Sequence, residues 1–129
     1  MGKRFLIDTN IAIYFLDGNL TPSVIVFLQP VINQEINISV ITKIELLGWS
    51  FPNSNKFEIH NEFVSQSNIF PLDDEIVEKT IEIRRTYKIK LPDALIAATA
   101  IIFDMTLLSR NDKDFTQIPE LKYMNPFTI

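Results

Sequence analysis

The sequence predicts an α/β domain in which a mainly parallel sheet carries helices on both faces. Short apolar runs typical of buried strands alternate with longer stretches in which apolar residues recur at helical spacing. The alternation runs along all 129 residues without an internal repeat, a linker or a low-complexity segment. This length fits one domain, and strands that alternate with helices favour parallel pairing with both sheet faces covered.

Composition narrows the class of protein further. Apolar residues make up 47% of the chain, which indicates a folded rather than a disordered protein, and the absence of cysteine excludes a disulfide framework and a thiolate zinc site. No apolar run approaches the roughly 20 residues that a membrane span needs, and Asp8 interrupts any signal-peptide pattern. We therefore expect a cytoplasmic protein without membrane contact. A net charge of −4 argues against nucleic-acid binding by bulk charge, but not against an acidic, metal-dependent nucleic-acid enzyme.

The first strand is predicted at Phe5-Leu6-Ile7, and it ends on a carboxylate, Asp8. A charge at the end of a buried strand is costly without a partner, and ligands of open α/β sheets bind at the carboxyl ends of the strands. Asp8 is therefore a site candidate. Alternatively, Asp8 or Thr9 simply caps the helix predicted over residues 11–16. This stretch alone does not decide between the two interpretations.

Two helices and a strand follow. Thr21-Pro22 starts a helix over residues 22–34, in which Pro30 should produce a kink or a break. Residues 36–39 form a strand, and Ser39 is placed to cap a helix over residues 40–49. Apolar positions of that helix are Ile41, Ile44, Leu47 and Trp49. Its lone carboxylate, Glu45, lies at the edge of this apolar surface, and the alternative interpretation is an ordinary solvated glutamate.

The middle of the chain predicts a helix over residues 55–68, a strand-like segment over residues 69–72 and a helix from the acids at 73–75 through Tyr87. His60 is the only histidine, so we interpret it as a surface or packing residue rather than a metal ligand. Basic residues at the end of the last helix complement the helix dipole and form the densest basic cluster: Arg84, Arg85, Lys88 and Lys90.

The last third begins with the most apolar helix, predicted over residues 94–103 and opened by Leu91-Pro92-Asp93. Asp93 is the only charge in its first turns, where the dipole favours a carboxylate. A strand over residues 105–109, a polar loop over residues 110–115 and a short strand over residues 122–127 complete the chain.

These elements allow four carboxylates to converge. The carboxyl ends of parallel strands share one edge of a sheet. Asp8 and Asp112 follow predicted strands, Asp93 starts a buried helix, and Glu45 lies on a helix that follows a strand, so three or four of them could meet at that edge. Clustered carboxylates repel one another, and Mg²⁺ or Mn²⁺ would balance them through oxygen ligands. Such a site can activate water and stabilise charge on a phosphate.

Four segments in this order resemble the PIN-domain ribonucleases, and among them the VapC-type toxins of toxin–antitoxin pairs. They are Phe5-Leu6-Ile7-Asp8-Thr9-Asn10, the lone Glu45, residues 91–100 and residues 108–115. The resemblance spans nearly the whole chain. It implies a single PIN-like domain over residues 1–129, with three layers in the order α/β/α.

The resemblance also implies a Mg²⁺-dependent endoribonuclease, with Mn²⁺ as an alternative ion and transfer or ribosomal RNA as substrate. Asp8, Glu45, Asp93 and an acid of the last loop would bind the metal, and Asn10 would support them. It further implies a homodimer and a cognate VapB-type antitoxin. The rival interpretations are a metal-dependent DNA nuclease or phosphatase, and a non-catalytic nucleic-acid or protein-binding module, against which the retention of all four acids counts.

Two aspartates compete for the fourth position. We favour Asp112, which lies nearer the strand end, while Asp114 is placed to cap the turn at residues 115–118. The alternative is that Asp114 faces the site and Asp112 is solvated. Arg110, Lys113 and the basic cluster could contact phosphates, although a solvated surface role is the better interpretation for each one alone.

Overall fold

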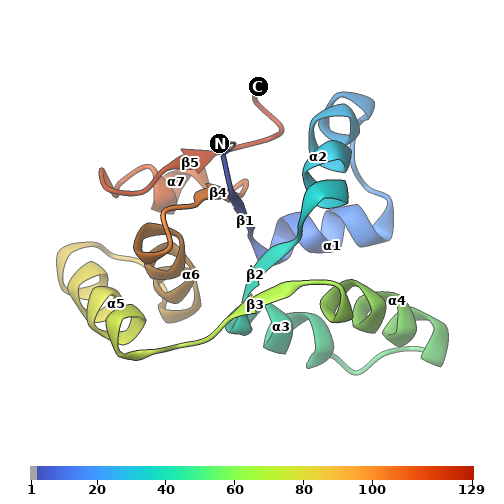
Figure 1. Ribbon diagram of the computed structural model, residues 1–129, viewed down its shortest axis with the longest axis horizontal. Coiled ribbons are helices and arrows are strands. Elements are labelled where there is room, and N and C mark those ends of the chain that lie inside the picture. Colours follow the sequence, from blue (N-terminus) through green and yellow to red (C-terminus); the bar gives the residue numbers. More distant parts are fainter. Residues whose placement is uncertain (1–2) are drawn as a thin grey trace.

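The computed structural model describes residues 3–129, which form short strands surrounded by helices (Figure 1). The strands are β1 (Phe5–Ile7), β2 (Asn37–Ser39), β3 (Asn68–Phe70), β4 (Thr106–Leu108) and β5 (Tyr123–Met124). The helices are α1 (Thr9–Asp17), α2 (Pro22–Gln34), α3 (Val40–Leu47), α4 (Ser54–Ser65), α5 (Asp74–Thr86), α6 (Leu91–Ile102) and α7 (Asp112–Phe115). The predicted alternation of strands and helices is confirmed.

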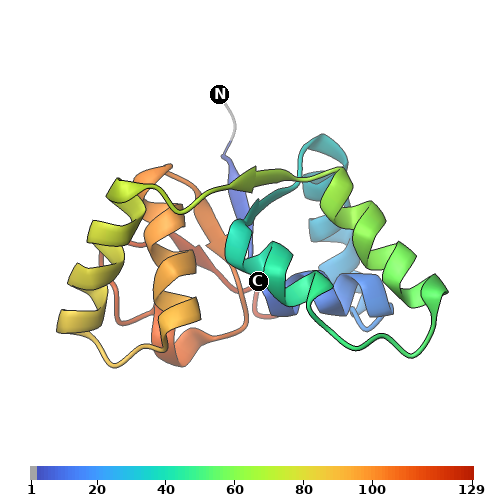
Figure 2. The ribbon, with the colours of Figure 1, turned by 90° about the horizontal axis from the view of Figure 1, so that it is seen from below.

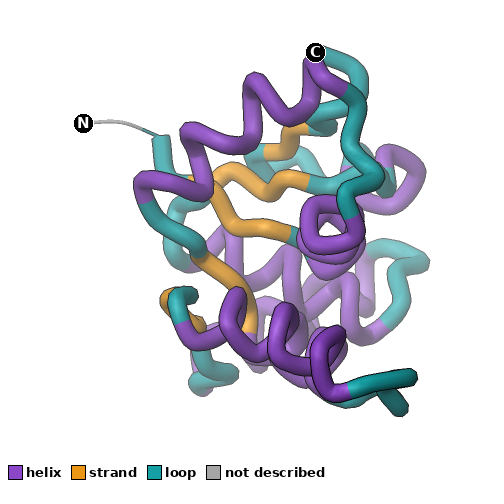
Figure 3. The backbone as a smooth tube through the Cα atoms, turned by 90° about the vertical axis from the view of Figure 1, so that its right-hand side faces the viewer, coloured by secondary structure: helices purple, strands orange, loops and turns teal. Residues whose placement is uncertain are grey.

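Every strand pair is parallel. β4 lies between β1 and β5, and β2 pairs with β3. The two groups meet where β2 lies beside β1, and there the Asn37 Nδ2 donates to the Phe5 carbonyl oxygen at 3.0 Å. Figure 3 shows the strands, in orange, grouped in the middle of the molecule between the helices.

Helices cover both faces of the strands, as the sequence predicts. Leu6 and Leu107 face each other across β1 and β4 and pack with α5 and α6. The next residues along the two strands, Ile7 and Leu108, point to the opposite face and pack with α1, α2, α3 and α4. Because successive side chains of a strand alternate between faces, two short apolar strands suffice to supply two cores. In Figures 1 and 2, α5 and α6 lie on one side of the strands, and α1, α3 and α4 lie on the other.

Polar side chains at strand ends start the following helices. The Ser39 Oγ, directly after β2, accepts from the Ile41 backbone N–H at 3.1 Å, which confirms its predicted capping role. The Asp73 Oδ1 accepts from the Ile76 N–H at 3.0 Å and so begins α5. Strand ends and helix starts are therefore coupled, and this fixes where each helix leaves the sheet.

Helix α2 runs unbroken from Pro22 to Gln34 with Pro30 inside it, so the predicted break is wrong. Leu28 and Val31, on either side of Pro30, pack against the same core and hold the helix together across the missing N–H. No single helix within residues 3–129 is long and apolar enough to cross a membrane; α1 and α2 together reach that length and composition, but they meet at a bend of 110°.

Helix α3 turns a different face inward from the one its apolar residues suggest. It ends at Leu47, and Ile44 and Trp49 are 59% and 46% exposed, whereas Thr42 is fully buried. The reason is tertiary, because Thr42 lies against the polar end of β1, with its Oγ1 3.0 Å from the Thr9 Oγ1. The prediction of Ile44 and Trp49 as part of an apolar packing face is therefore wrong.

One further difference concerns residues 110–115, and one prediction, for His60, is confirmed. Residues 110–115, predicted as a polar loop, contain the short helix α7, because the Asn111 Oδ1 accepts from the Asp114 N–H at 3.3 Å and anchors Phe115 in the core. His60 is buried in α4 and donates from Nδ1 to the Leu46 carbonyl oxygen at 2.8 Å, which confirms a packing role.

Candidate functional site

Asp8 sits at the carboxyl end of β1 and is only 4% exposed. Its Oδ1 accepts from the Thr9 N–H at 2.9 Å, and its Oδ2 accepts from the Ser109 Oγ, at the end of β4, at 2.7 Å. The pKa of this carboxyl group is raised from 3.8 to about 6, chiefly by burial and also by the nearby charges of Asp93 and Glu45, against the lowering effect of its two hydrogen bonds. Asp8 therefore caps α1, as one of the two sequence interpretations has it, and is also a carboxyl group held in the interior, while its role as a site residue stays a prediction.

Glu45 reaches this edge from the middle of α3. The Thr9 Oγ1, which follows Asp8, donates to the Glu45 Oε1 at 2.6 Å. This hydrogen bond joins the end of β1 to the helix that follows β2. Glu45 is therefore not an ordinary solvated glutamate but is oriented toward Asp8 by a buried hydroxyl group.

Asp93 lies in the first turn of α6 and is half-buried. Desolvation raises the pKa of its carboxyl group, and the charges of Asp114 and Glu45 raise it further, while Lys90 lowers it. The charges of Glu45 and Asp93 thus act on Asp8, and the charge of Glu45 acts on Asp93. These acids come near one another from different segments of the chain, and their role in binding a metal stays a prediction.

The two acids of the last segment lie in different surroundings. The Asp112 Oδ1 accepts from the Tyr123 hydroxyl and from the Asn125 Nδ2, the latter at 3.1 Å, so one of its oxygens is already engaged. Asp114 faces Asp93 closely enough to raise its pKa, and its Oδ2 accepts from the Asn111 Nδ2 at 2.9 Å. The geometry favours Asp114, the alternative in the sequence analysis, over Asp112.

The expected capping role of the Asp114 side chain is wrong. Asn111 holds that carboxylate instead, and the turn after α7 is closed by the Asp114 main-chain oxygen, which accepts from the Gln117 N–H at 3.4 Å. The physical reason is that Asn111 starts α7, and the Asp114 side chain therefore turns back toward the side-chain amide of Asn111.

The remaining predicted residues lie around this edge. Asn10 is exposed and lines a hollow together with Thr9 and Glu45, and within residues 3–129 no hydrogen bond joins it to the acids. The Arg110 guanidinium lies 4.0 Å from the centre of the Phe127 ring. Arg84 donates to the Ile89 carbonyl oxygen at 2.9 Å, so it serves the loop before α6.

The acids fit a hydrated divalent cation better than a fully enclosed one. Within the part of the chain that the structure describes, none of Asp8, Glu45, Asp93, Asp112 and Asp114 forms an ion pair. In the same residues, no three acid or histidine side chains lie close enough together to ligate one ion. Mg²⁺ commonly keeps several waters and takes only one or two carboxylates directly, so this donor set suits it.

Sequence reasoning missed the residues that hold these acids in place. Ser109 donates to the Asp8 carboxylate, and Thr9 donates to that of Glu45. Both residues lie at the ends of predicted strands, where a small hydroxyl residue is a usable signal. Tyr123 and Asn125, which bind Asp112, offer no such signal. They reach it only because β5 lies beside β4.

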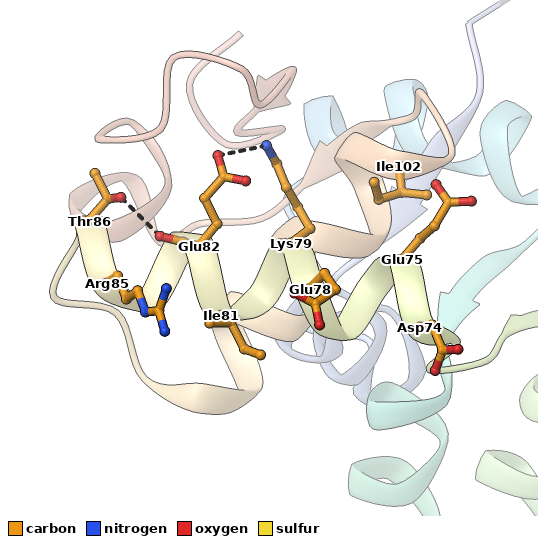
Figure 4. Close-up of a pocket in the computed structure, with 9 residues that line it drawn as sticks. All are labelled: Asp74, Glu75, Glu78, Lys79, Ile81, Glu82, Arg85, Thr86 and Ile102. Carbon is orange, nitrogen blue, oxygen red and sulfur yellow. Dashed lines mark hydrogen bonds and ion pairs between the residues drawn. The ribbon is translucent and has the colours of Figure 1, made fainter.

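A second acidic hollow, of about 690 Å³, lies on the outer face of α5 (Figure 4). Asp74, Glu75, Glu78 and Glu82 line it, together with Lys79. The Lys79 Nζ pairs with Glu82 at 3.2 Å and with Glu120 at 2.7 Å, and this raises the pKa of the lysine. The acids are exposed and share a helix with their counter-charge, so nothing in this hollow calls for a metal ion.

Comparison with known proteins places the fold. The model of the PIN domain matches residues 5–121. Among solved structures, a chain of the VapBC2 complex from Rickettsia felis bound to a promoter DNA fragment is 26% identical, with 94% of this chain and 97% of that chain covered and a TM-score of 0.80. A chain of a Klebsiella pneumoniae toxin–antitoxin complex is 29% identical, with 96% and 98% covered and a TM-score of 0.71.

A chain of the DNA-bound VapBC complex from Salmonella typhimurium is 21% identical, with 97% and 99% covered and a TM-score of 0.83, and this likeness shows the fold alone. No curated protein sequence matches this chain. The family model covers most of the chain, from β1 through the segment after α7, and therefore all the acids described above. This chain belongs to the PIN-domain family.

Proposed function

We propose that this protein is a VapC-type toxin that cleaves RNA phosphodiester bonds with the help of Mg²⁺ or Mn²⁺. Membership of the PIN family and the likeness to chains of VapBC complexes support a toxin nuclease. The observation that carries the proposal is the buried Asp8, whose pKa is raised by burial and, to a smaller extent, by its acidic neighbours, and which has no ion pair within the described residues. A carboxylate in that position needs a cation.

The acids would share this work unequally. One or two of Asp8, Glu45 and Asp93 would bind the cation directly and the others through its water molecules, with Asp114 as the fourth acid and Asp112 as its alternative. Ser109 fixes the Asp8 carboxylate from one side, and Thr9 fixes that of Glu45. Residues that orient metal-binding carboxylates through hydrogen bonds contribute strongly to metal affinity, so both hydroxyl groups belong to the working site.

When bound, the ion would lower the pKa of the attacking water and neutralise charge on the phosphodiester. Arg110 and Lys113 are exposed and flank Asp112 in sequence, and they would contact neighbouring phosphates. Transfer RNA or ribosomal RNA is the proposed substrate class. Because the net charge is −4, the bound cation rather than the protein surface would attract the phosphate.

The proposed partners are a cognate antitoxin and a second copy of this chain. A pocket of carboxylates without an ion pair attracts a guanidinium group, which pairs with carboxylates in a bidentate manner. We therefore expect the antitoxin to inhibit the enzyme by placing an arginine among the acids. Inhibition that survives removal of every Arg and Lys from the contacting segment of the antitoxin would contradict this, and light scattering on the purified toxin would measure the homodimer.

The test is cleavage of labelled transfer RNA, ribosomal RNA and DNA by the purified protein, with Mg²⁺, Mn²⁺ or EDTA. The proposal predicts cleavage of RNA with either ion and none with EDTA. Cleavage of DNA alone would assign a DNA nuclease instead. Absence of cleavage of any substrate, with the protein folded and the antitoxin removed, would assign a non-catalytic module.

A further inference from the structure

We propose that the hollow beside Glu45 binds a nucleobase next to the scissile phosphodiester, with Trp49 as the surface on which the base stacks. This inference rests on the proposed ribonuclease function and names a contact that the function does not itself require. The hollow encloses about 380 Å³ and is lined by Thr9, Asn10, Ile13, Ile44, Glu45, Gly48 and Trp49. That volume is within the range of small-molecule sites.

The hollow is continuous with the acid site. Glu45 lies in its wall, and the Thr9 hydroxyl that orients Glu45 lies beside it. An RNA strand with a phosphodiester at the acids must therefore place an adjoining nucleotide at or near this hollow. The residues that line the hollow therefore lie beside the acids rather than on a distant surface.

Trp49 and Ile44 explain why the hollow suits a flat apolar group. Both side chains are about half exposed, although the helix that carries Ile44 is otherwise anchored by buried Thr42 and Leu46. Exposed large apolar side chains gathered around a polar group mark a binding surface more often than chance placement does. A nucleobase offers two apolar faces and a polar edge, which matches this mixture, and the exposed Asn10 amide can meet such an edge.

The indole of Trp49 is held in place from behind. Its ring centre lies 5.7 Å from that of His60 and 6.4 Å from that of Phe51, and His60 in turn donates to the carbonyl oxygen of Leu46. Gly48 fixes the chain direction just before it, because a Cβ there would lie 2.6 Å from the Ile44 carbonyl oxygen. A rigid aromatic ring loses little conformational entropy when a ligand binds, so this arrangement is prepared for stacking.

The charge of the protein gives a reason for such a contact. Proteins that bind single-stranded nucleic acid usually combine a basic groove with aromatic side chains that stack on the bases. With a net charge of −4, this chain gains little from phosphate contacts alone, so the base contacts must contribute a larger share of the affinity.

The experiment uses Trp49 as its own reporter, because it is the only tryptophan of the chain. The wild-type protein is mixed rapidly with short unstructured RNA in the presence of Mg²⁺, and tryptophan fluorescence is followed before the first turnover is complete. We expect saturable quenching. In a matched control, Trp49→Phe is combined with Ile81→Trp, which moves the tryptophan to the outer face of α5. The Ile81 side chain is 40% exposed there, and no quenching is expected.

Kinetics with an otherwise unaltered protein test the contribution to binding. Trp49→Leu keeps an apolar side chain but removes the stacking surface, and we expect KM for RNA to rise roughly tenfold to a hundredfold with kcat nearly unchanged. Trp49→Phe should retain part of the affinity. Ile44→Ala should raise KM by a smaller factor, and Val26→Ala, an equally simple truncation at an exposed position of α2, should leave it unchanged. Thermal unfolding confirms that each variant folds.

The possible failures are distinct. A wild-type protein that cleaves RNA but shows no quenching by RNA, together with an unchanged KM in Trp49→Leu, overturns the inference and leaves the ribonuclease intact. Trp49→Leu that binds RNA normally but loses affinity for the purified antitoxin assigns the hollow to the protein partner, which also overturns it. Loss of RNA cleavage in the wild type, with EDTA-insensitive quenching by RNA, overturns the proposed function but leaves the base contact standing.

Discussion

The protein has two groups of carboxylates, and the contrast between them shows what distinguishes a candidate site from an acidic surface. On α5, exposed acids accompany Lys79, which pairs with Glu82 and Glu120. At the carboxyl edge of the strands, Asp8 and its neighbours Glu45 and Asp93 are buried or half-buried and have no ion pair within residues 3–129.

The pKa values follow this difference. Desolvation raises the pKa of both Asp8 and Asp93, and the like charges around them raise it further. On α5 the raised pKa belongs instead to the lysine, because its acidic partners stabilise the charged form. The number of acids in a region is thus a poor guide, whereas burial without a counter-charge indicates a position where a cation would bind.

The largest effect is expected when the Asp8 charge is removed. Asp8→Asn keeps size and shape, but it should reduce RNA cleavage by more than the roughly 10- to 100-fold that the loss of an outer hydrogen-bonding partner costs. The measurement is the single-turnover rate at saturating Mg²⁺. Glu78→Gln on α5 is the matched control and should cleave at the wild-type rate, and equal rates for both variants would remove the distinction between the two acidic groups.

The same substitution should stabilise the metal-free protein. Because the folded-state pKa of Asp8 is about 6 and the ordinary value is 3.8, the folded state binds more protons between these values. The free energy of unfolding therefore falls as the pH rises through this window, and the cost reaches up to roughly 3 kcal/mol above it.

Urea unfolding in EDTA measures this cost. Asp8→Asn should be more stable than the wild type at pH 7.5, and the two should converge near pH 4. Added Mg²⁺ should stabilise the wild type at pH 7.5 and leave the variant nearly unaffected. Parallel stability curves for the two proteins across this pH range would contradict the assignment of a buried, uncompensated charge.

A smaller effect is expected from the hydroxyl group that orients Glu45. Thr9→Val keeps the shape of the side chain and removes the donor to the Glu45 Oε1. The Mg²⁺ concentration for half-maximal activity should rise roughly 10- to 100-fold, and Thr9→Ser should restore most of it. Equal defects in the Val and Ser variants would show that packing, not the hydrogen bond, matters at this position.

The choice between Asp112 and Asp114 sharpens the comparison at the rim of the site. Since Asp114 is the acid whose charge acts on Asp93, Asp114→Asn should raise the Mg²⁺ requirement by about tenfold. Asp112→Asn should leave the requirement unchanged, because the Asn oxygen can still accept from Tyr123. Mg²⁺ titrations of both variants decide the matter, and a shift in Asp112→Asn alone would exchange the two roles.

The smallest effect belongs to the paired acids of α5. Lys79→Met removes the counter-charge of Glu82 and Glu120 but keeps the length of the side chain. Ion pairs of this exposed kind contribute about 0.2–1 kcal/mol, so urea unfolding should register a change within that range at low salt and less in 1 M salt. A larger loss, or any change in the Mg²⁺ requirement, would show that the two acidic groups are coupled.

The sequence predicted the fold well because its signals are local. The apolar strand at residues 5–7, the strand predicted over residues 105–109 and found at 106–108, the cap at Ser39, the acidic start of α5 and the buried helix after Asp93 each follow from residue type and spacing. The orientation of α3 could not be predicted in the same way. Thr42 is buried because it meets Thr9 across the fold, and no periodicity of α3 encodes that contact.

The site shows the same division. The strand-end position of Asp8 and the dipole-favoured position of Asp93 are visible in the chain, so their convergence follows from parallel strands. The preference for Asp112 rested on its nearness to the strand end and on a capping role for Asp114. The helix start at Asn111 could not be foreseen, and its local hydrogen bond to the Asp114 carboxylate makes Asp114 the candidate that the geometry favours.

The junction between β1 and β2 has a mechanical consequence. Within the described residues no backbone ladder joins these strands, and the Asn37 side chain bridges them instead. A side-chain bridge can break without disturbing a backbone ladder, so β1 and β2 can separate locally at lower cost than the laddered pair β1 and β4. A cation that binds both Asp8 and Glu45 would link the two segments, and amide hydrogen exchange along β2 should slow when Mg²⁺ binds.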